Sequence, residues 1–308
     1  MKFSHLLLAV LLFVISALSC AEEKNSVEEE SDEVDCQSCK DSQRWNVGVA
    51  IGAGVITNPL AIEDDIYFPL VPRISYYGDK FFLDNLTLGY TAYQSSSLRL
   101  YITGKLNSDF LYFEGATDTV KAFAYFSQVT GIRRTDGMDP LLNFGDYHLN
   151  DRKASYLLGP ELVWQFDETK SLKLDVRKDI SRIHYGQEAS VEFKYANYIE
   201  DWYFEQRFGV TWKSAEVNDY YYGISFEETP TELPTGQTMP DRYRENLTYK
   251  ANETVTPHLA LNVSTAVSEN WTFLTSIKVE FLDDAVINSP LVDQDYSISA
   301  FVGWGYEF

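Results

Sequence analysis

The side chains best suited to catalysis in this 308-residue chain are the three histidines that follow its first 21 residues. His148 lies in a polar connection, His258 begins an alternating segment, and His184 stands within Ser-Arg-Ile-His-Tyr-Gly. Ser181 or Ser190 is a candidate nucleophile for His184, but closeness in sequence does not establish the hydrogen-bond reach that a triad needs. No Gly-x-Ser-x-Gly, paired-histidine or phosphate-loop motif is present. The sequence therefore predicts no enzyme, no cofactor and no metal site.

Two of the three cysteines lie in an acidic segment, residues 22–44, that has no aromatic residue. Such a segment cannot bury enough apolar surface to fold, so we expect a flexible tail. Cys36 and Cys39 form Cys-Gln-Ser-Cys within it, and in an oxidising compartment we expect a local disulfide between them. Redox catalysis would require a supporting fold and a helix N-terminus that lowers the thiol pKa, and the segment predicts neither.

The N-terminal residues predict export. Lys2 precedes an apolar run at 6–18, which is too short to cross a bilayer as a helix but fits a secretory signal peptide. Ser19-Cys20-Ala21 places small residues at a cleavage site, so residues 1–21 are the predicted signal peptide. In a second interpretation Cys20 becomes a lipidated N-terminus, anchored by acyl chains.

The composition excludes one class of partner and favours a membrane protein. The formal net charge of −21 argues against nucleic acid, because phosphate binding needs a basic face. Aromatic residues make up 15% of the chain although the mean hydropathy is slightly negative, which is typical of strands with one lipid-facing side. The acidic clusters at 63–65, 227–228 and 283–284 lack the spacing of a calcium loop and are predicted to be solvated.

The dominant pattern after residue 44 is an alternation of apolar and polar residues with a period of two, which indicates strands. In the last segment one face is apolar and the other small or polar, with Phe301 as the exception. The chain ends on alternate apolar residues that resemble the signal read by the barrel-assembly machinery: Val302, Trp304, Tyr306 and Phe308.

These segments predict an all-β fold, an antiparallel transmembrane β-barrel of about twelve strands (10–14) over 45–308, in the outer membrane of a Gram-negative cell. A soluble β-sandwich also alternates, but the terminal phenylalanine and the aromatic strand ends favour the barrel. The connection 227–255 is expected outside the cell and 108–151 in the periplasm. The predicted strands are 45–56, 67–77, 80–93, 97–107, 152–166, 170–178, 187–198, 201–213, 219–226, 256–267, 270–282 and 295–308.

Charged residues on the polar strand faces are predicted to point into the lumen. In one interpretation they form a narrow pore for small, including anionic, solutes. In the other, which we favour, cross-strand ion pairs fill and close a small barrel. The residues concerned are Arg73, Arg99, Lys105, Lys173, Arg177, Lys194, Arg207, Lys213 and Lys278, with Glu161, Asp175, Glu192, Glu205 and Glu280.

Two C-terminal elements resemble motifs of the MltA-interacting protein/OmpV family of outer-membrane proteins. One is Tyr220-Tyr-Tyr-Gly-Ile-Ser-Phe-Glu-Glu-Thr, and the other is Asp284-Ala-Val-Ile-Asn-Ser-Pro-Leu-Val before the last strand. Weaker similarities lie at 69–82 and 179–186. The matching motif positions are Tyr222, Gly223, Ser225, Glu228, Ser289 and Pro290.

The resemblance implies a non-catalytic scaffold in the outer-membrane bilayer that brings together a lytic transglycosylase and a penicillin-binding protein. The acidic tail and 108–151 depart from the family pattern, and we expect these two regions to contact periplasmic murein enzymes, the tail through charge complementarity. The pore competes with this hypothesis. A lipid-active outer-membrane enzyme is the remaining alternative.

Overall fold

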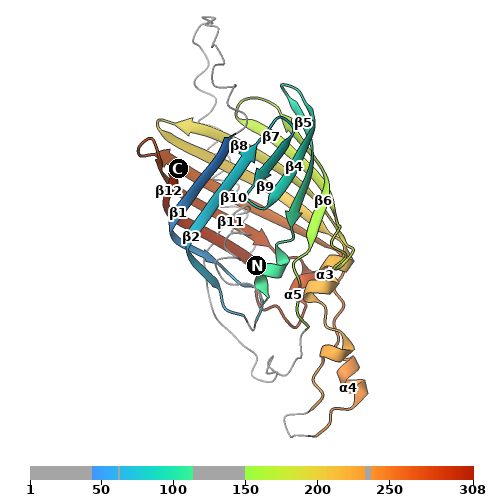
Figure 1. Cartoon of the computed structure of the whole chain (residues 1–308). Coiled ribbons are helices and arrows are strands. Elements are labelled where there is room, and N and C mark those ends of the chain that lie inside the picture. Colours follow the sequence, from blue (N-terminus) through green and yellow to red (C-terminus); the bar gives the residue numbers. More distant parts are fainter. Residues whose placement is uncertain (1–43, 62, 114–149, 233–236) are drawn as a thin grey trace, which may run out of the picture. The chain divides into compact units, whose positions relative to one another are not determined.

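The computed structural model describes residues 44–61, 63–113, 150–232 and 237–308. In this part of the chain, twelve antiparallel strands close into a barrel (Figure 1). Each strand pairs with its sequence neighbours, and β12 pairs with β1 from Gly48↔Glu307 to Ile56↔Ser299. The predicted all-β barrel is therefore confirmed. The predicted signal peptide, Cys20, and the tail cysteines Cys36 and Cys39 lie outside the described residues.

The strands differ in length, and β3 is the shortest. Within the described ranges, no helix combines the length and apolar composition needed to cross a bilayer. The strands are β1 Arg44–Ile56, β2 Ile66–Tyr77, β3 Phe81–Asp84, β4 Thr87–Gln94, β5 Leu98–Leu106, β6 Tyr156–Gln165, β7 Lys170–Asp179, β8 Gln187–Ile199, β9 Trp202–Lys213, β10 Thr254–Ala266, β11 Trp271–Phe281 and β12 Tyr296–Glu307.

The single strand predicted at 80–93 is wrong, because the chain turns back inside it. Asn85 adopts a φ of 51°, a left-handed conformation that asparagine tolerates better than most residues. Its backbone N–H donates to the Ile74 carbonyl at 2.8 Å, and its Oδ1 accepts from the Ile74 N–H at 3.1 Å. This turn separates β3 from β4.

The strand predicted at 219–226 is also wrong, since helix α3 spans Ala215–Tyr222. Its buried residues are Val217, Asn218, Tyr221 and Tyr222, which recur at the spacing of one helix face. The run of three tyrosines favours a strand by propensity, but burial of this face overrides that preference.

These two errors leave the number of strands unchanged, but they change the end of the barrel at which the chain leaves β5 and enters β6. Five strands, β1 to β5, precede residue 107, so the chain leaves the wall at Leu106 on the end opposite Trp45 and Phe308. It re-enters at Tyr156 on that same end. The four strands predicted before residue 108 would have placed the flanks of 108–151 at the same end as Trp45, which is wrong; residues 114–149 lie outside the described residues. We call the end with the long connections the loop end and the other the short-turn end.

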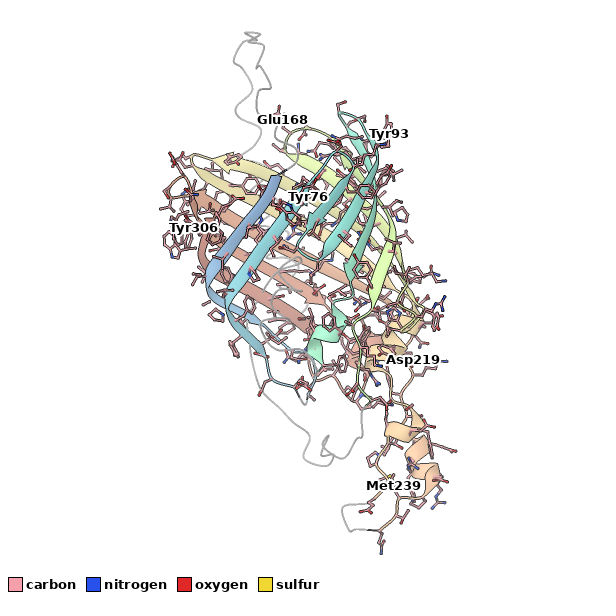
Figure 2. All side chains as sticks on the ribbon, in the orientation of Figure 1. Tyr76, Tyr93, Glu168, Asp219, Met239 and Tyr306 are labelled. Carbon is pink, nitrogen blue, oxygen red and sulfur yellow. The ribbon has the colours of Figure 1, made fainter. Side chains whose placement is uncertain are left out.

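The outer face of the wall is apolar and rich in aromatic residues. Figure 2 shows side chains projecting around the barrel, with Tyr306, Tyr93 and Glu168 toward the short-turn end. Trp304 is 47% exposed and Val302 46% exposed on the outer surface. Near the C-terminus the rings of Tyr306 and Phe308 lie 5.0 Å apart, and Phe273 and Trp304 5.1 Å apart. Such an aromatic girdle is typical of membrane barrels.

The main hydrophobic core lies at the loop end, inside the barrel. After β5, a 3₁₀ helix (η2, Asp109–Tyr112) packs with α3 and with the segment around α5 (Asp284–Ile287). Phe301, the exception to the alternation, points inward and stacks on Phe68 at 6.1 Å as part of this core. We call the following core residues, all of which lie in connections between strands, the plug: Phe110, Leu111, Tyr112, Phe113, Val217, Tyr221, Tyr222, Leu291 and Val292.

Candidate functional site

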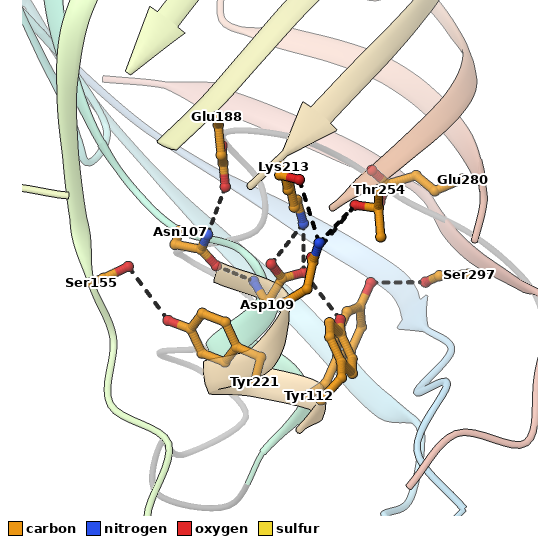
Figure 3. A network of polar contacts seen from close by, with 12 residues as sticks. Asn107, Asp109, Tyr112, Ser155, Glu188, Lys213, Tyr221, Thr254, Glu280 and Ser297 are labelled. Atoms are coloured by element: carbon orange, nitrogen blue, oxygen red, sulfur yellow. Dashed lines mark hydrogen bonds and ion pairs between the residues drawn. The ribbon is translucent and has the colours of Figure 1, made fainter. Parts of the chain in front are cut away.

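A buried ion pair anchors the plug to the barrel wall (Figure 3). The Lys213 Nζ at the end of β9 lies 2.7 and 2.6 Å from the two carboxylate oxygens of Asp109. The Tyr222 hydroxyl donates to the same carboxylate at 3.1 Å. Burial, together with that carboxylate, raises the pKa of Tyr222 well above its ordinary value. A single acid thus joins η2, β9 and α3.

Two further contacts fix η2 to other strands. The Asn107 side-chain amide donates to Glu188 at 2.6 Å, while its Oδ1 accepts from the Asp109 N–H at 2.7 Å. Lys105, one of the predicted lumen charges, pairs with Glu188 at 3.2 Å. On the opposite side, the Tyr112 hydroxyl donates to the Ser297 hydroxyl on β12 at 3.0 Å. The plug is therefore bonded to both sides of the wall.

The family-motif residues of the first segment gather around Arg152. Its guanidinium contacts Glu228 at 2.7 Å and the Gly223 carbonyl at 3.0 Å. The Ser225 backbone N–H and hydroxyl both donate to the second Glu228 oxygen at 2.9 Å. Burial alone would raise the pKa of Glu228, but the donors led by Arg152 outweigh it and lower the pKa to about 2.

The second motif segment meets the first at the plug. The Ser289 hydroxyl donates to the Tyr222 carbonyl at 2.6 Å and accepts from the Leu291 N–H at 3.3 Å. Pro290 follows directly and is half-buried. Motif residues that lie far apart in sequence therefore converge on one structural cluster at the loop end.

His184, the strongest catalytic candidate in the sequence, has a hydrogen-bond pattern that opposes a triad. Its Nε2 lies 2.8 Å from the Ser155 hydroxyl, a partner that spacing did not suggest. Its Nδ1 accepts from the Gly186 N–H at 3.0 Å, so the ring proton belongs on Nε2. A general base for Ser155 would need Nε2 free of its proton. Burial also lowers the pKa of His184.

The two serines suggested as nucleophiles, Ser181 and Ser190, and the acid beside the His184 ring, Asp179, form hydrogen bonds with other groups. Asp179 Oδ2 lies 3.9 Å from His184 Nδ1 and accepts from the backbone N–H of residues 183, 184 and 185. Ser181 donates to Asp179 at 2.5 Å, and Ser190 donates to Asp175. Neither serine has a hydrogen bond to His184 among the contacts of the described residues. The arrangement holds the loop between β7 and β8 in shape.

Most of the predicted lumen charges meet in ion pairs, some between neighbouring strands and some within one strand. Arg177 contacts Asp175 and lies 2.5 Å from Glu161. The remaining ion pairs are Lys173 with Glu192 (3.0 Å), Arg207 with Glu205 (3.4 Å) and Glu192 (4.0 Å), Lys194 with Glu205 (3.7 Å), and Lys278 with Glu280 (2.8 Å). His258 also contacts Glu192 at 3.2 Å, and Arg99 donates to Gln165 at 3.3 Å. In the described part of the chain, Arg73 has neither an ion pair nor a hydrogen bond.

Below the plug, the lumen contains a cavity of about 700 Å³. Its lining reaches the short-turn rim at Asn270 and Glu307 and extends inward to Ala50 and Val71, both members of the loop-end core. The cavity therefore opens toward the short-turn end, and two wall residues of the core, Ala50 and Val71, belong to its lining. No His, Cys, Asp or Glu cluster suited to a metal ion occurs among the residues described.

The chain matches known proteins over most of its length. A family model described as MltA-interacting protein MipA matches residues 49–308. The chain belongs to this family. The MltA-interacting protein of Escherichia coli (strain K12) is 25% identical over 257 residues, which cover 83% of this chain and 88% of that protein. YiaT of the same strain, whose name includes the words outer membrane protein, is 22% identical over 239 residues, covering 77% and 81%.

A solved structure with a similar outline is the CymD monoaromatic hydrocarbon channel. It is 13% identical, covers 87% of this chain and 89% of its own, and has a TM-score of 0.33. That score is too low to carry a functional inference. Family membership and the closed barrel identify this chain as an outer-membrane β-barrel, and the resemblance drawn from its motifs is confirmed.

Sequence reasoning missed three residues that organise the site. Asp109 lies near the start of a connection that had no predicted structure, and Arg152 and Ser155 were assigned to the start of the strand predicted at 152–166. Each is a buried or half-buried polar residue. The only sequence signal was polar residues beside aromatic ones in 107–113 and a polar run at 150–155, and neither identifies a partner residue.

Proposed function

We propose that this outer-membrane barrel is a non-catalytic scaffold that brings together a lytic transglycosylase and a penicillin-binding protein. The observation that carries the proposal is the plug, which fills the loop end of the lumen and is bonded to several strands. A barrel closed in this way offers surfaces for partners rather than a passage for solutes. The name of the Escherichia coli relative, an MltA-interacting protein, supports the same role.

The chemistry of the described side chains supports the non-catalytic part of the proposal. His184 donates through Nε2 to Ser155 and accepts through Nδ1, so it is placed to stabilise a loop. The lumen carboxylates Glu161 and Glu205 are already paired with cations. A lipid-active enzyme would require a nucleophile beside an unprotonated base, and this pair does not provide one.

The surfaces that we propose for partner proteins differ from the two regions expected from the sequence. Membrane barrels have short periplasmic turns and longer outer loops, so we assign the short-turn end to the periplasm. Murein enzymes would then contact that end, where the tail joins β1 and where the turns at 78–80, 166–169 and 267–270 lie. The described flanks of the other region expected to contact partners, 107–113 and 150–155, lie at the loop end, so we do not count these flanks among the periplasmic surfaces.

The experiment is an assembly assay with the full chain in detergent micelles, a purified lytic transglycosylase and a purified penicillin-binding protein. We expect the two enzymes to co-elute from a sizing column only when the barrel is present. Co-elution without the barrel, or binding of neither enzyme, would contradict the scaffold. Assays for phospholipid and peptidoglycan hydrolysis by the barrel alone should give no product, and turnover would contradict its non-catalytic character.

The narrow pore is the second candidate, and the lumen cavity with Arg73 is the observation that favours it. Arg73 has no ion pair or hydrogen bond within the described ranges, and a lumen cation of this kind would attract anions. The plug opposes this function because conduction needs an opening at both ends of the barrel. Conductance measurements separate the two candidates.

A further inference from the structure

We propose that the lumen cavity is a closed-ended binding site for a carboxylate-bearing sugar–peptide, reached from the short-turn end. The inference deepens the proposed function, on which it rests for the choice of ligand. The cavity holds about 700 Å³, within the range of small-molecule sites, and it lies away from the loop-end motif cluster.

The first argument is an imbalance among the charged groups that line the cavity. Glu161 accepts from Arg177 at 2.5 Å, and Glu205 accepts from Asn262 at 2.9 Å and Tyr203 at 3.0 Å. Asp84 accepts from the Tyr77 hydroxyl at 3.2 Å. These three carboxylates therefore already have donors, while Glu307 lies exposed at the rim.

The two guanidinium groups of the lining differ from these carboxylates. Arg73 has no hydrogen bond or ion pair within the described residues. The Arg207 Nε lies 3.4 Å from a Glu205 carboxylate oxygen, and its Nη1 lies 4.0 Å from Glu192, so both of these ion pairs are long. A guanidinium has five N–H donors, Arg73 is exposed, and the long ion pairs of Arg207 leave donors on both groups for a ligand. Both groups match a carboxylate or another planar anion on a ligand.

The rest of the lining defines the remainder of the ligand. Ser264 and Thr272, on neighbouring strands, contribute hydroxyl groups that suit the hydroxyls and amides of a sugar or peptide. Val71, Phe82 and Leu274 contribute apolar surface, which suits methyl groups and sugar-ring faces. A simple inorganic anion would use only the arginines. An acidic sugar–peptide would use all three kinds of lining.

Access is from one side. Asn270, Glu307 and the Gly48 segment form the rim at the short-turn end, while the plug lies at the opposite, loop end of the barrel. A ligand that enters must leave by the same opening. Binding is therefore expected to saturate without any transfer across the membrane.

The test is calorimetric titration of the folded full chain in micelles with muramyl dipeptide, which carries one free carboxylate, at 150 mM salt. Its neutral amide and succinate serve as comparison ligands. We expect saturable 1:1 binding of muramyl dipeptide, at least tenfold weaker binding of the amide, and no measurable binding of succinate. Equal binding of the amide, tight binding of succinate, or absence of binding would overturn the proposal.

The matched variants are Arg73→Gln, Arg207→Gln and Arg99→Gln. Arg73 and Arg207 line the cavity, and loss of a charge-assisted hydrogen bond is expected to weaken binding about tenfold in each variant. Arg99 donates to Gln165 and does not line the cavity, so its variant should bind as the unchanged chain does. Equal loss in all three variants, or loss in neither cavity variant, would contradict the site.

Folding and scaffold function are measured in parallel. A heat-dependent gel shift establishes that each variant is a closed barrel, and Arg73→Lys, which keeps the charge but loses the fork of donors, should retain part of the affinity. The assembly assay with the two murein enzymes is repeated on Arg73→Gln. Failure of ligand binding with intact assembly rejects only the cavity site, whereas failed assembly of the unchanged chain rejects the scaffold.

Discussion

At the scale of single residues, polar side chains at the loop end stabilise connections that the barrel wall cannot. Glu228 illustrates this, because it accepts from Arg152, from the Asn150 N–H at 2.9 Å and from both donors of Ser225. These donors favour the ionised carboxylate and therefore lower the pKa of Glu228. The motif residues of the family thus have structural roles that their contacts explain.

Substitution of Glu228 should loosen this connection in a pH-dependent way. The ionised form is favoured in the folded chain, with a pKa of about 2 against an ordinary 4.5, so its stabilisation is complete above pH 4.5 and disappears as the pH falls toward 2. At pH 7, Glu228→Gln should speed hydrogen exchange at the Ser225 and Asn150 amides about tenfold or more. The exposed Glu227→Gln variant is the control and should exchange as the unchanged chain does.

The proton position on His184 is a second residue-scale prediction. Burial lowers the pKa of His184, so the neutral ring is favoured and stability is lost as the pH falls below the ordinary value of 6.5. ¹⁵N chemical shifts of the labelled ring should report a neutral tautomer protonated on Nε2 at pH 6.5. A proton on Nδ1 with Nε2 free would restore Ser155 as a candidate nucleophile.

Only part of this detail was predictable from sequence. The alternation in the sequence assigns charged residues such as Arg177 to the polar face of a strand, because a strand sends every second side chain to the same face. The contacts of the plug were not predictable, since they join residues far apart. Tyr222 and Asp109 are 113 positions apart, and Arg152 and Glu228 are 76 apart. The motif resemblance named Tyr222 and Glu228 but not their partners.

At the scale of elements, the strands are well predicted and the loop-end structure is not. The contrast between a lipid-facing side and a polar side allows long strands such as β9 and β12 to be predicted from the sequence. It fails at β3, which has four residues, and at α3, whose tyrosines resemble a strand. Phe301, the one break in the last alternation, marks where the wall faces the plug rather than open lumen.

The Lys213–Asp109 pair should be the most sensitive contact of the plug. Asp109→Ala leaves the Lys213 ammonium buried and unpaired, which is expected to cost about 3–5 kcal/mol of unfolding free energy. Asp241→Ala removes a partner that is 81% exposed and 3.8 Å from Arg244, so its cost should stay below about 1 kcal/mol. Urea unfolding in micelles measures both, and equal costs would contradict the anchoring role.

The closing seam between β1 and β12 requires glycine where the backbones approach. A Cβ on Gly303 would lie 2.4 Å from the Ile51 carbonyl oxygen, so Gly303→Ala should impair closure and reduce the heat-dependent gel shift. Gly305 is the control, because a Cβ there meets first the flexible Leu274 side chain at 3.1 Å. Full closure of the Gly303→Ala variant would show that the seam can adjust.

At the scale of the whole molecule, the barrel resembles a cup in the outer membrane. Its outer wall is apolar, its loop end is filled by the plug, and its cavity opens at the short-turn end. Two opposite errors in strand assignment left the predicted count unchanged, so the count alone could not reveal which end each connection occupies. The end of the barrel at which the described flanks 107–113 and 150–155 lie became clear only from the pairing of β5 with β6.

Single-channel recording of the full chain in planar bilayers tests the closed end most directly. The account predicts no steady conductance steps from the folded, unchanged barrel, because the plug blocks the loop end. Asp109→Ala, which frees the plug from Lys213, should produce flickering openings in the same bilayers. Steady steps of uniform size from the unchanged chain would contradict the account and make the barrel a pore.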